Sequence, residues 1–442
     1  MKRYIVTAYT PNSKVNKKAF NTLKLIAKKK KAELLVFCVG HNYKKDIGIV
    51  DKEVLPYIAP LGFKFNEKLS VCNIATGINI LDPLTGMDSV SSVNGSMIVP
   101  ANRHRTKLVA RSLKHSTTPR GMFCTGTISE PYYKTTKTAF KVADFHLYGG
   151  LLVEVKTKKE FNVRQLEFKG NCIYDLTSKY TSTKEVKNIP LEGISLGDVH
   201  PPFINPAVLE ETLELLKKTK VKSVFLHDLF DACSVSHHAE GKFLTQSVIA
   251  HAYPNLEAEV QLTADTLADI QKAQPKAKLY VVKSNHDEHL DRYLDECRFK
   301  GDRANLIYAL ELAKVKAMKD LGLSEVGALE YALNQKSSKI SKVKFLDRRD
   351  ILTIAGIECS NHGDYGANGS RGNAKQHGLA FTGKIVTGHI HTPEIGVYGN
   401  YVNGTMTYLS MPYTNDSGTS GWLNTHTMIY ANGARSQYNI II

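Results

Sequence analysis

The spacing of apolar positions divides the chain into two parts of different character. Residues 1–50 show a short apolar run, a stretch with apolar positions at helical spacing and a second apolar run, which predicts strand, helix, strand. From about 51 to 190 the apolar runs are short and broken by Gly, Pro, Asn and Ser, as in strands separated by turns. The polar segment 177–187 is rich in Lys, Ser and Thr, and we place a domain boundary there.

Beyond this boundary, strand-like runs alternate with amphipathic stretches, which is typical of a layered α/β domain. The apolar periodicity predicts, for example, a helix over 206–219 and a strand over 278–282. The fold class that we predict is therefore α/β. Sheets flanked by helices would occupy residues 189–442, and an extra α/β or α+β domain of unknown role would occupy residues 1–188.

The net charge of the chain indicates what kind of partner it binds. The chain has 58 Lys and Arg against 42 Asp and Glu, a formal net charge of +16. A basic protein is expected to bind a polyanion, and nucleic acid is the first polyanion to consider. Five basic residues crowd the segment 103–114, which we interpret either as a basic face for nucleic acid or as an ordinary solvated helix.

Other bulk features favour a cytoplasmic protein. No apolar stretch approaches the roughly 18 residues of a membrane helix, so we expect no membrane span. The N-terminal residues reach no apolar core of the kind that a secretory signal has. The seven cysteines are scattered and form no CxxC pair, as in proteins of a reducing compartment.

Side chains that commonly bind metals stand where the strand-like runs end, at the edge where open α/β sheets form their sites. Their carboxylate, amide and imidazole groups suit divalent first-row metals. A strand would direct His389 and His391, two residues apart, to the same side. Seven ligands exceed the needs of one ion with a bound water and fit two ions that share a carboxylate. The candidates are Asp198, His200, Asp228, Asn285, His362, His389 and His391.

The order of these motifs is similar to that of a known family. Asp-x-His, Asp-x-x-Asp, Asn-His-Asp, a lone His and Gly-His-x-His follow one another over roughly 190–440. This ordered set resembles the calcineurin-like metallophosphoesterase superfamily. The resemblance implies a layered metallophosphoesterase sandwich of β-sheets flanked by helices. It also implies a cofactor of two divalent metal ions, Mn²⁺ first, with Mg²⁺, Fe²⁺ or Zn²⁺ as alternatives.

The resemblance implies a role for each ligand as well. One metal would be held by Asp198, His200 and His391. The second metal would be held by Asn285, His362 and His389. Asp228 would bridge the two ions. His286 would lie beside the metals near the leaving group as the general acid, and Asp287 would orient it.

Two positions depart from the family's pattern. The second motif usually begins Gly-Asp, but here His227 precedes Asp228. The third motif usually begins Gly-Asn, but here Ser284 precedes Asn285. Both changes replace a small flexible residue outside the ligands, so they bear on local backbone geometry more than on ligation. We do not expect His227 to bind metal.

Two further stretches are candidates for substrate contact. His237 and His238 closely follow the bridging carboxylate, where they could contact a phosphate or form a surface turn. The Gly-rich segment 365–372 directly follows the lone His of the motif set. With Asn368 and Arg371 it could cradle a phosphodiester, or it could be a plain flexible loop.

These observations favour a metal-dependent DNA nuclease, with DNA as partner and a homo-oligomer as a possible state. The stretch Asp228–Asp231 resembles the nuclease branch of the superfamily, which contains the SbcD-like double-strand-break nucleases. The layout, with an extra domain in front, resembles DNA-degradation and DNA-transfer proteins of large tailed phages, which would place the protein in the host cytoplasm. The alternatives are a phosphatase or a cyclic or small-molecule phosphodiesterase, and a nucleic-acid-binding or assembly protein with a structural metal.

Overall fold

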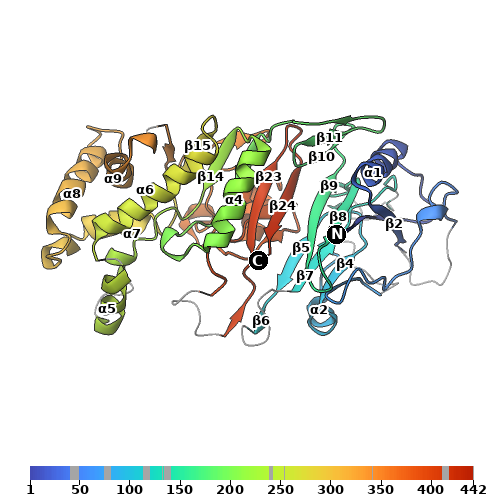
Figure 1. Cartoon of the computed structure of the whole chain (residues 1–442), viewed down its shortest axis with the longest axis horizontal. Coiled ribbons are helices and arrows are strands. Elements are labelled where there is room, and N and C mark those ends of the chain that lie inside the picture. Colours follow the sequence, from blue (N-terminus) through green and yellow to red (C-terminus); the bar gives the residue numbers. More distant parts are fainter. Residues whose placement is uncertain are drawn as a thin grey trace.

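The computed structural model is an elongated α/β molecule in which sheets fill the middle and one end, and helices form the other end (Figure 1). The mixed α/β class predicted for the chain is confirmed. The structure describes residues 1–39, 49–73, 81–112, 120–131, 133, 141–237, 242–252, 254–340, 342–410 and 418–441.

The N-terminal part begins with a four-stranded sheet of order β2-β1-β8-β9. Helix α1 (Lys17–Lys30) connects the parallel strands β1 and β2, and the Asn16 side chain caps it by accepting a hydrogen bond from the Ala19 amide. The strand, helix and strand predicted over residues 1–50 are therefore confirmed. The strands are β2 (Glu33–Cys38), β1 (Lys2–Tyr9), β8 (Gly149–Val155) and β9 (Phe161–Glu167).

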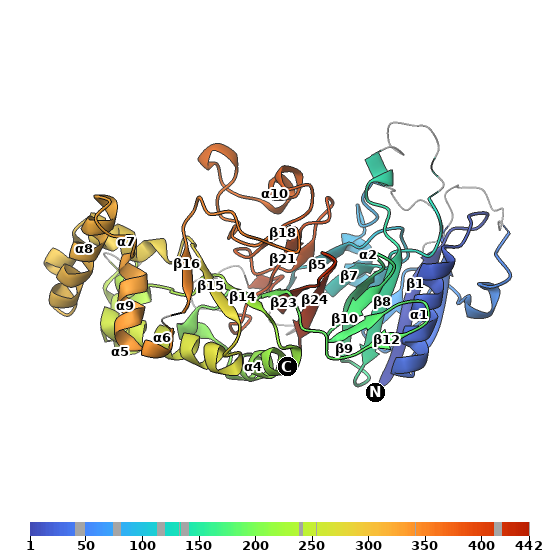
Figure 2. The same ribbon diagram turned by 90° about the horizontal axis from the view of Figure 1, so that it is seen from above.

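A six-stranded sheet of order β16-β15-β14-β13-β23-β24 forms the core of the second part. Its first four strands are parallel, and β23 and β24 form an antiparallel hairpin beside β13. Helices α4 (Pro206–Thr219) and α6 (Leu256–Ala273) lie along one face (Figure 2). The bounds of α4 and β15 are those predicted. The strands are β13 (Gly193–Ser195), β14 (Ser223–Leu226), β15 (Lys278–Val282), β16 (Lys344–Leu346), β23 (Asn424–Ile429) and β24 (Arg435–Ile440).

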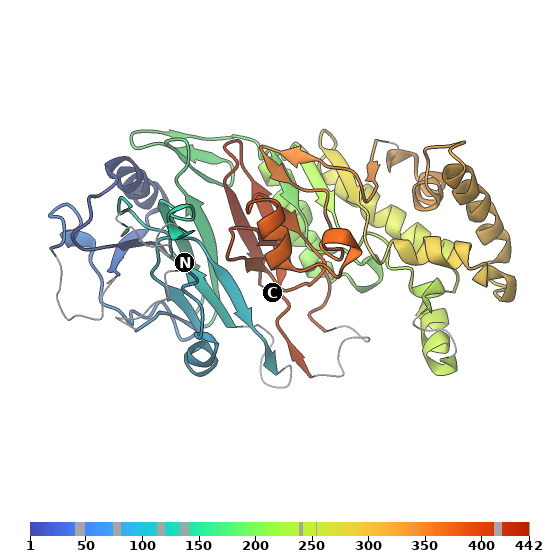
Figure 3. The same ribbon diagram turned by 180° about the vertical axis from the view of Figure 1, so that it is seen from behind.

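The other face of this sheet is covered by short strands and by helix α10 (Ala374–Ala380) (Figure 3). Phe225 of β14 stacks on Tyr280 of β15, with ring centroids 5.1 Å apart, in a buried apolar layer that holds both strands near their carboxyl ends. The remaining elements of this part include β17 (Thr353–Ile354), β18 (Ile357–Glu358), α5 (Phe243–Ala252), α7 (Glu288–Asp295), α8 (Leu306–Asp320) and α9 (Ala328–Lys336).

A seven-stranded sheet of order β19-β21-β20-β5-β7-β4-β3 contains strands from both sides of residue 188. The link is the pairing of β20 with β5, at Ile395 and Thr106. This sheet joins the N-terminal part of the chain to the second part. Helix α2 (Asp88–Asn94) packs against it. Its strands are β19 (Val386–Thr387), β21 (Tyr401–Val402), β20 (Glu394–Ile395), β5 (Thr106–Val109), β7 (Arg120–Cys124), β4 (Ser96–Val99) and β3 (Leu69–Val71).

The polar segment at which we placed a domain boundary is not an irregular linker. It contributes to a three-stranded antiparallel sheet that packs on both parts of the chain, with Ile173 in the N-terminal core and Tyr174 stacked on Tyr430. Elsewhere, one strand of the N-terminal part pairs with one strand of the second part. The first sheet is made of β10 (Ile173–Asp175), β11 (Ser178–Tyr180) and β12 (Glu185–Val186). The second pairing joins β6 (Arg111–Ser112) and β22 (Thr419–Ser420).

The cluster of basic residues at 103–114 is neither a solvated helix nor a basic face in the part that the structure describes. Its residues 106–109 and 111–112 are in strands, and its three arginines are buried. Arg105 pairs with Asp82 and with Glu394, each at 3.0 Å. The guanidinium of Arg111 donates to the Ser420 carbonyl at 2.8 Å. These cations join the two parts of the chain, which periodicity could not show because their partners lie far away in the sequence.

Replacing Arg105 with Ala should destabilise the fold. The arginine side chain is only 4% exposed, and its loss leaves two carboxylates without their cation. Breaking a fully buried ion pair costs about 3–5 kcal/mol, and because Asp82 and Glu394 are partly exposed we expect about 2–3 kcal/mol. Denaturant unfolding followed by circular dichroism measures this change. Arg349→Ala, at an exposed position, is the control and should stay within about 0.5 kcal/mol of wild type. Equal stability of the two variants would contradict the prediction.

Candidate metal centre

The predicted ligands gather where adjacent parallel strands end. Asp198 follows β13, Asp228 follows β14 and Asn285 follows β15. Because the three strands are neighbours and run in the same direction, their carboxyl ends lie at one edge of the sheet. Both carboxylates are almost completely buried there.

Backbone strain accompanies this cluster. Four of the predicted ligands have the left-handed conformation, which costs roughly 1–2 kcal/mol for a residue other than Gly. Such strain is found where a site requires a particular side-chain direction. The four are His200 (φ 43°), Asp228 (φ 45°), His389 (φ 75°) and His391 (φ 54°).

The expectation that His389 and His391 point the same way is wrong. Strand β19 ends before them, and the positive φ at both residues turns the chain between them. His391 faces Asp198 and His200, whereas the ring of His389 lies 5.2 Å from that of His362. The side chains of the two histidines therefore lie on opposite sides of the cluster.

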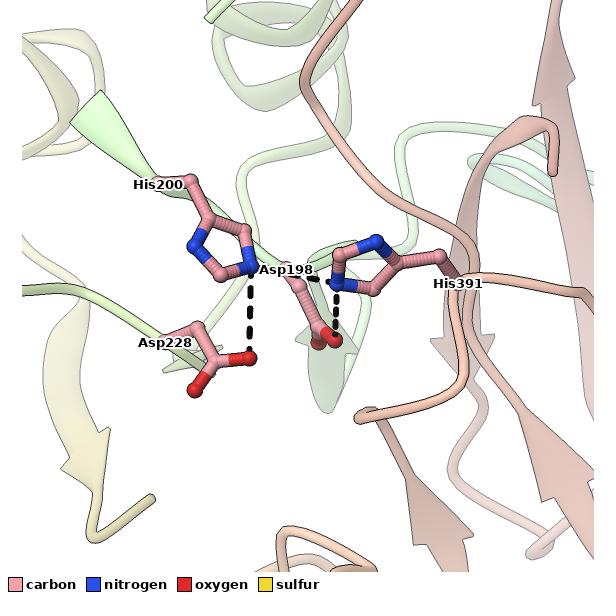
Figure 4. Close-up of side chains that lie close together, drawn as sticks. All are labelled: Asp198, His200, Asp228 and His391. Carbon is pink, nitrogen blue, oxygen red and sulfur yellow. Dashed lines mark hydrogen bonds and ion pairs between the residues drawn. The ribbon is translucent and has the colours of Figure 1, made fainter. Parts of the chain in front are cut away.

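One side of the cluster contains two carboxylates and two imidazoles (Figure 4). Their ligand atoms all lie within 4.8 Å of one another. Nε2 of His391 is 3.1 Å from Oδ2 of Asp198, and Nε2 of His200 is 3.3 Å from Oδ2 of Asp228. The two Nε2 atoms are 3.1 Å apart. The four residues are Asp198, His200, Asp228 and His391.

The other side brings the predicted second set toward the same carboxylate. Nε2 of His362 lies 3.3 Å from Oδ1 of Asp228 and 3.2 Å from Oδ1 of Asn285. Asp228 thus turns one oxygen toward each side. This is the position that a carboxylate shared by two metal ions would occupy.

The donor set fits divalent cations. Oδ1 of Asp198 is buried and has no hydrogen-bond partner among the described residues, an arrangement that is costly unless a cation satisfies the oxygen. Two imidazole nitrogens at 3.1 Å cannot both carry a proton on the facing atom, so at least one lone pair points into the cluster. Lone pairs of imidazole and ionised carboxylate are the ligands that first-row divalent metals take.

The electrostatics of the cluster keep its carboxylates ionised and the His391 ring neutral. Burial alone would raise the pKa of Asp228, but His362, His286 and His200 hold that pKa well below its usual range. Burial lowers the pKa of His391, so its ring favours the neutral form. Metal ligands have to be ionised carboxylates and neutral imidazoles. Against the effect of burial, Asp228 raises the pKa of His200 and, to about 9, that of His362, so a metal ion would have to displace a proton from these two rings.

Asp231 contacts the predicted general acid, and the described contacts of Asp287 lie elsewhere. Oδ1 of Asp231 lies 2.8 Å from Nδ1 of His286 and 2.6 Å from Nδ1 of His200. The carboxylate of Asp287 instead accepts hydrogen bonds from the backbone amides of Phe230 and Ser284. The orienting role expected of Asp287 is therefore corrected to Asp231. The Asp-x-x-Asp spacing contained this residue, but only the fold shows which carboxylate faces His286.

Of the two histidines predicted to contact substrate, His237 lies in the part of the chain that the structure describes. The ring of His237 lies 5.1 Å from that of His289, which in turn lies 5.1 Å from that of His286. His237 is therefore near the site, and its Nε2 lies 3.0 Å from the guanidinium of Arg292. His238 lies outside the described residues.

The Gly-rich loop lies at the surface beside the cluster. Asn368 and Arg371 are exposed, and the described contacts do not bring either side chain to the metal ligands. The base of the loop is anchored by Arg348, whose guanidinium makes two 2.7 Å contacts with Asp364 and stacks on Tyr365. The phosphate cradle stays a prediction.

The N-terminal part of the chain reaches the rim of the cluster. Trp422, the only tryptophan of the chain, packs its ring 4.4 Å from that of His391. Trp422 directly follows strand β22, which pairs with β6 of the N-terminal part. Strand β6 of the N-terminal part therefore pairs with residues that lie close in sequence to the side chain packed on His391.

Comparison with known proteins places the chain beside one phage protein. It is 34% identical over 339 residues to protein A1 of Escherichia phage T5, a match that covers 72% of this chain and 58% of that protein. The chain thus spans less than two thirds of the length of this relative. No protein-family model matches the chain, and no solved structure matches it. No helix among the described residues has the length and apolar character to cross a membrane.

Proposed function

We propose that this protein is a metallophosphoesterase of the calcineurin-like superfamily that uses two divalent ions, Mn²⁺ in the first instance, to hydrolyse the phosphodiester bonds of DNA. The proposal rests on the position of Asp228. Its two carboxylate oxygens face two buried sets of potential metal ligands, one oxygen toward each set, at one edge of the sheet. The layers of helices and sheets around that edge agree with the sandwich expected for the superfamily.

Asp198, His200 and His391 would hold one ion, and Asn285, His362 and His389 would hold the other. Two such ions, when bound, supply an activated water and neutralise the charge that develops on the phosphate. The proton transfer belongs to the chain itself. Asp231 holds Nδ1 of His286, so the ring is oriented to deliver its other proton to the departing oxygen.

Three observations support DNA as the substrate. The net charge of +16 favours a polyanion. The N-terminal part contributes strand β6 beside the site, so substrate can contact both parts of the chain. The similarity to a phage protein fits a setting in the host cytoplasm, where DNA is an available polyanion.

The wild-type protein should cleave DNA when Mn²⁺ is present and should lose this activity in EDTA. We would incubate it with labelled linear and circular DNA, alongside bis-p-nitrophenyl phosphate and p-nitrophenyl phosphate. Cleavage of the circle would show endonuclease action, and cleavage of the linear form alone would show exonuclease action. Hydrolysis of the small esters without DNA cleavage would contradict the proposed substrate. No hydrolysis by a protein that has bound metal would contradict the proposed enzyme and favour a structural metal site.

A further inference from the structure

The imidazole of His227 lies against the Nδ1 side of the His362 ring, and ligand atoms of His227, His362 and Asp198 lie within 4.8 Å of one another. Nε2 of His362 faces Asp228 and Asn285, at 3.3 and 3.2 Å. Nδ1 of the same ring lies 3.4 Å from Nδ1 of His227. His227 is 0% exposed, and the two rings are inclined by only 29°.

The far side of His227 is connected to strand β13. Its Nε2 lies 3.0 Å from Oγ of Ser195, and that hydroxyl accepts a hydrogen bond from the Asn403 amide at 2.7 Å. The same amide nitrogen also donates to the carbonyl of Leu196, which identifies it as the nitrogen end of the side chain. A continuous row of hydrogen-bonding groups thus runs from the carbonyl of Leu196, directly after β13, to the candidate metal ligand His362.

Ligation by His362 determines where the protons of this row lie. A metal at Nε2 of His362 needs a lone pair there, so the ring proton has to be on Nδ1. That N–H faces Nδ1 of His227, which must then accept. The proton of a neutral His227 is consequently on Nε2, where it can be donated to Ser195.

We propose that His227 is a positioning residue that accepts the Nδ1 proton of His362 and thereby holds Nε2 of His362 ready for the second metal ion. This inference rests on the metal site of the proposed function. It also explains why an imidazole stands where the resemblance leads one to expect Gly, because Gly has no side chain that could accept this proton. His227 does not bind metal itself in this arrangement.

Two polar substitutions at His227 test the roles of its two ring nitrogens separately. In His227→Asn the amide oxygen can occupy the place of Nδ1 and still accept from His362. In His227→Gln the longer side chain puts its amide near the place of Nε2, so contact with Ser195 is kept and the acceptor for His362 is lost. His104→Gln, at a buried histidine of the N-terminal part, is the matched control. Mn²⁺ binding to each protein is measured by isothermal titration calorimetry without DNA.

We expect two binding events in wild type, His227→Asn and His104→Gln. In His227→Gln one event should weaken about 10–100-fold, the usual cost of losing such a partner, while the other stays unchanged. A general structural fault would weaken both events in step with a lower melting temperature, and that result would overturn the inference. Equal binding by the Asn and Gln variants would also overturn it. Failure of wild type to bind Mn²⁺ would overturn the proposed metal site and this inference with it.

A measurement on the wild-type protein tests the same point if either variant does not fold. Nitrogen NMR of ¹⁵N-histidine-labelled, Zn²⁺-loaded protein should show His362 with a proton on Nδ1 and metal at Nε2. The signal is assigned by its loss in His362→Ala. A metal at Nδ1 of His362, or a proton at Nε2, would contradict the role proposed for His227.

Discussion

Asp228→Asn should abolish the binding of both metal ions and reduce phosphodiester hydrolysis by about a thousandfold or more. The carboxylate lies between His200 and His362, at 3.3 Å from each, so its two oxygens serve both sides of the cluster. An amide removes the negative charge and turns an N–H group toward one side. Metal ions supply several kcal/mol of transition-state stabilisation, and about 1.4 kcal/mol corresponds to a factor of ten in rate.

The single tryptophan gives a direct measurement of this loss. The Trp422 ring lies 4.4 Å from the ring of the candidate ligand His391, so a paramagnetic ion such as Mn²⁺ bound there should quench its fluorescence. Wild type should show saturable quenching, and Asp228→Asn should show none. Asp269→Asn, the same substitution at an exposed position of α6, is the control and should behave as wild type. Quenching of the Asp228→Asn variant at wild-type concentrations of Mn²⁺ would refute a bridging role.

His286→Ala should leave the Mn²⁺ quenching of Trp422 intact but slow DNA cleavage about 10²–10⁴-fold, the range for loss of a general acid. His286 is not one of the predicted ligands, and its Nδ1 contacts Asp231, so we expect both metals to stay bound without it. The loss should be much smaller with bis-p-nitrophenyl phosphate, whose leaving group departs without a proton. A similar loss on both substrates, or a loss of metal binding, would contradict the role of general acid.

Asp231→Asn extends this prediction, because Asp231 contacts two imidazoles. It holds Nδ1 of His286 at 2.8 Å and Nδ1 of the candidate ligand His200 at 2.6 Å. We therefore expect slower DNA cleavage together with metal affinity about 10–100-fold weaker, the usual cost of losing the partner of a ligand. Asp287→Asn should keep metal affinity, because its carboxylate accepts from the backbone amides of Phe230 and Ser284 and makes no described hydrogen bond with a predicted ligand. Equal effects of the two substitutions on metal affinity would contradict this assignment.

The local pattern of the sequence determined much of the second part of the fold. Apolar periodicity predicted α4 and β15 with the bounds that the structure has, because burying one face requires apolar residues at the spacing of a helix or a strand. The ligand positions followed from the same pattern. Parallel strands bring their carboxyl ends to one edge, so Asp198, Asp228 and Asn285 could be expected to converge.

Partners that lie far apart in sequence were decided by the tertiary structure alone. Arg103, Arg105 and Arg111 each bond to a group hundreds of residues away, and a seven-stranded sheet crosses the boundary expected from composition. Asp231 rather than Asp287 faces His286, because that choice depends on how two loops approach one another. Periodicity records whether a residue is buried and on which side of its element. It holds no information on which distant group shares that space, and the protons, metals and charges of this site depend on that choice.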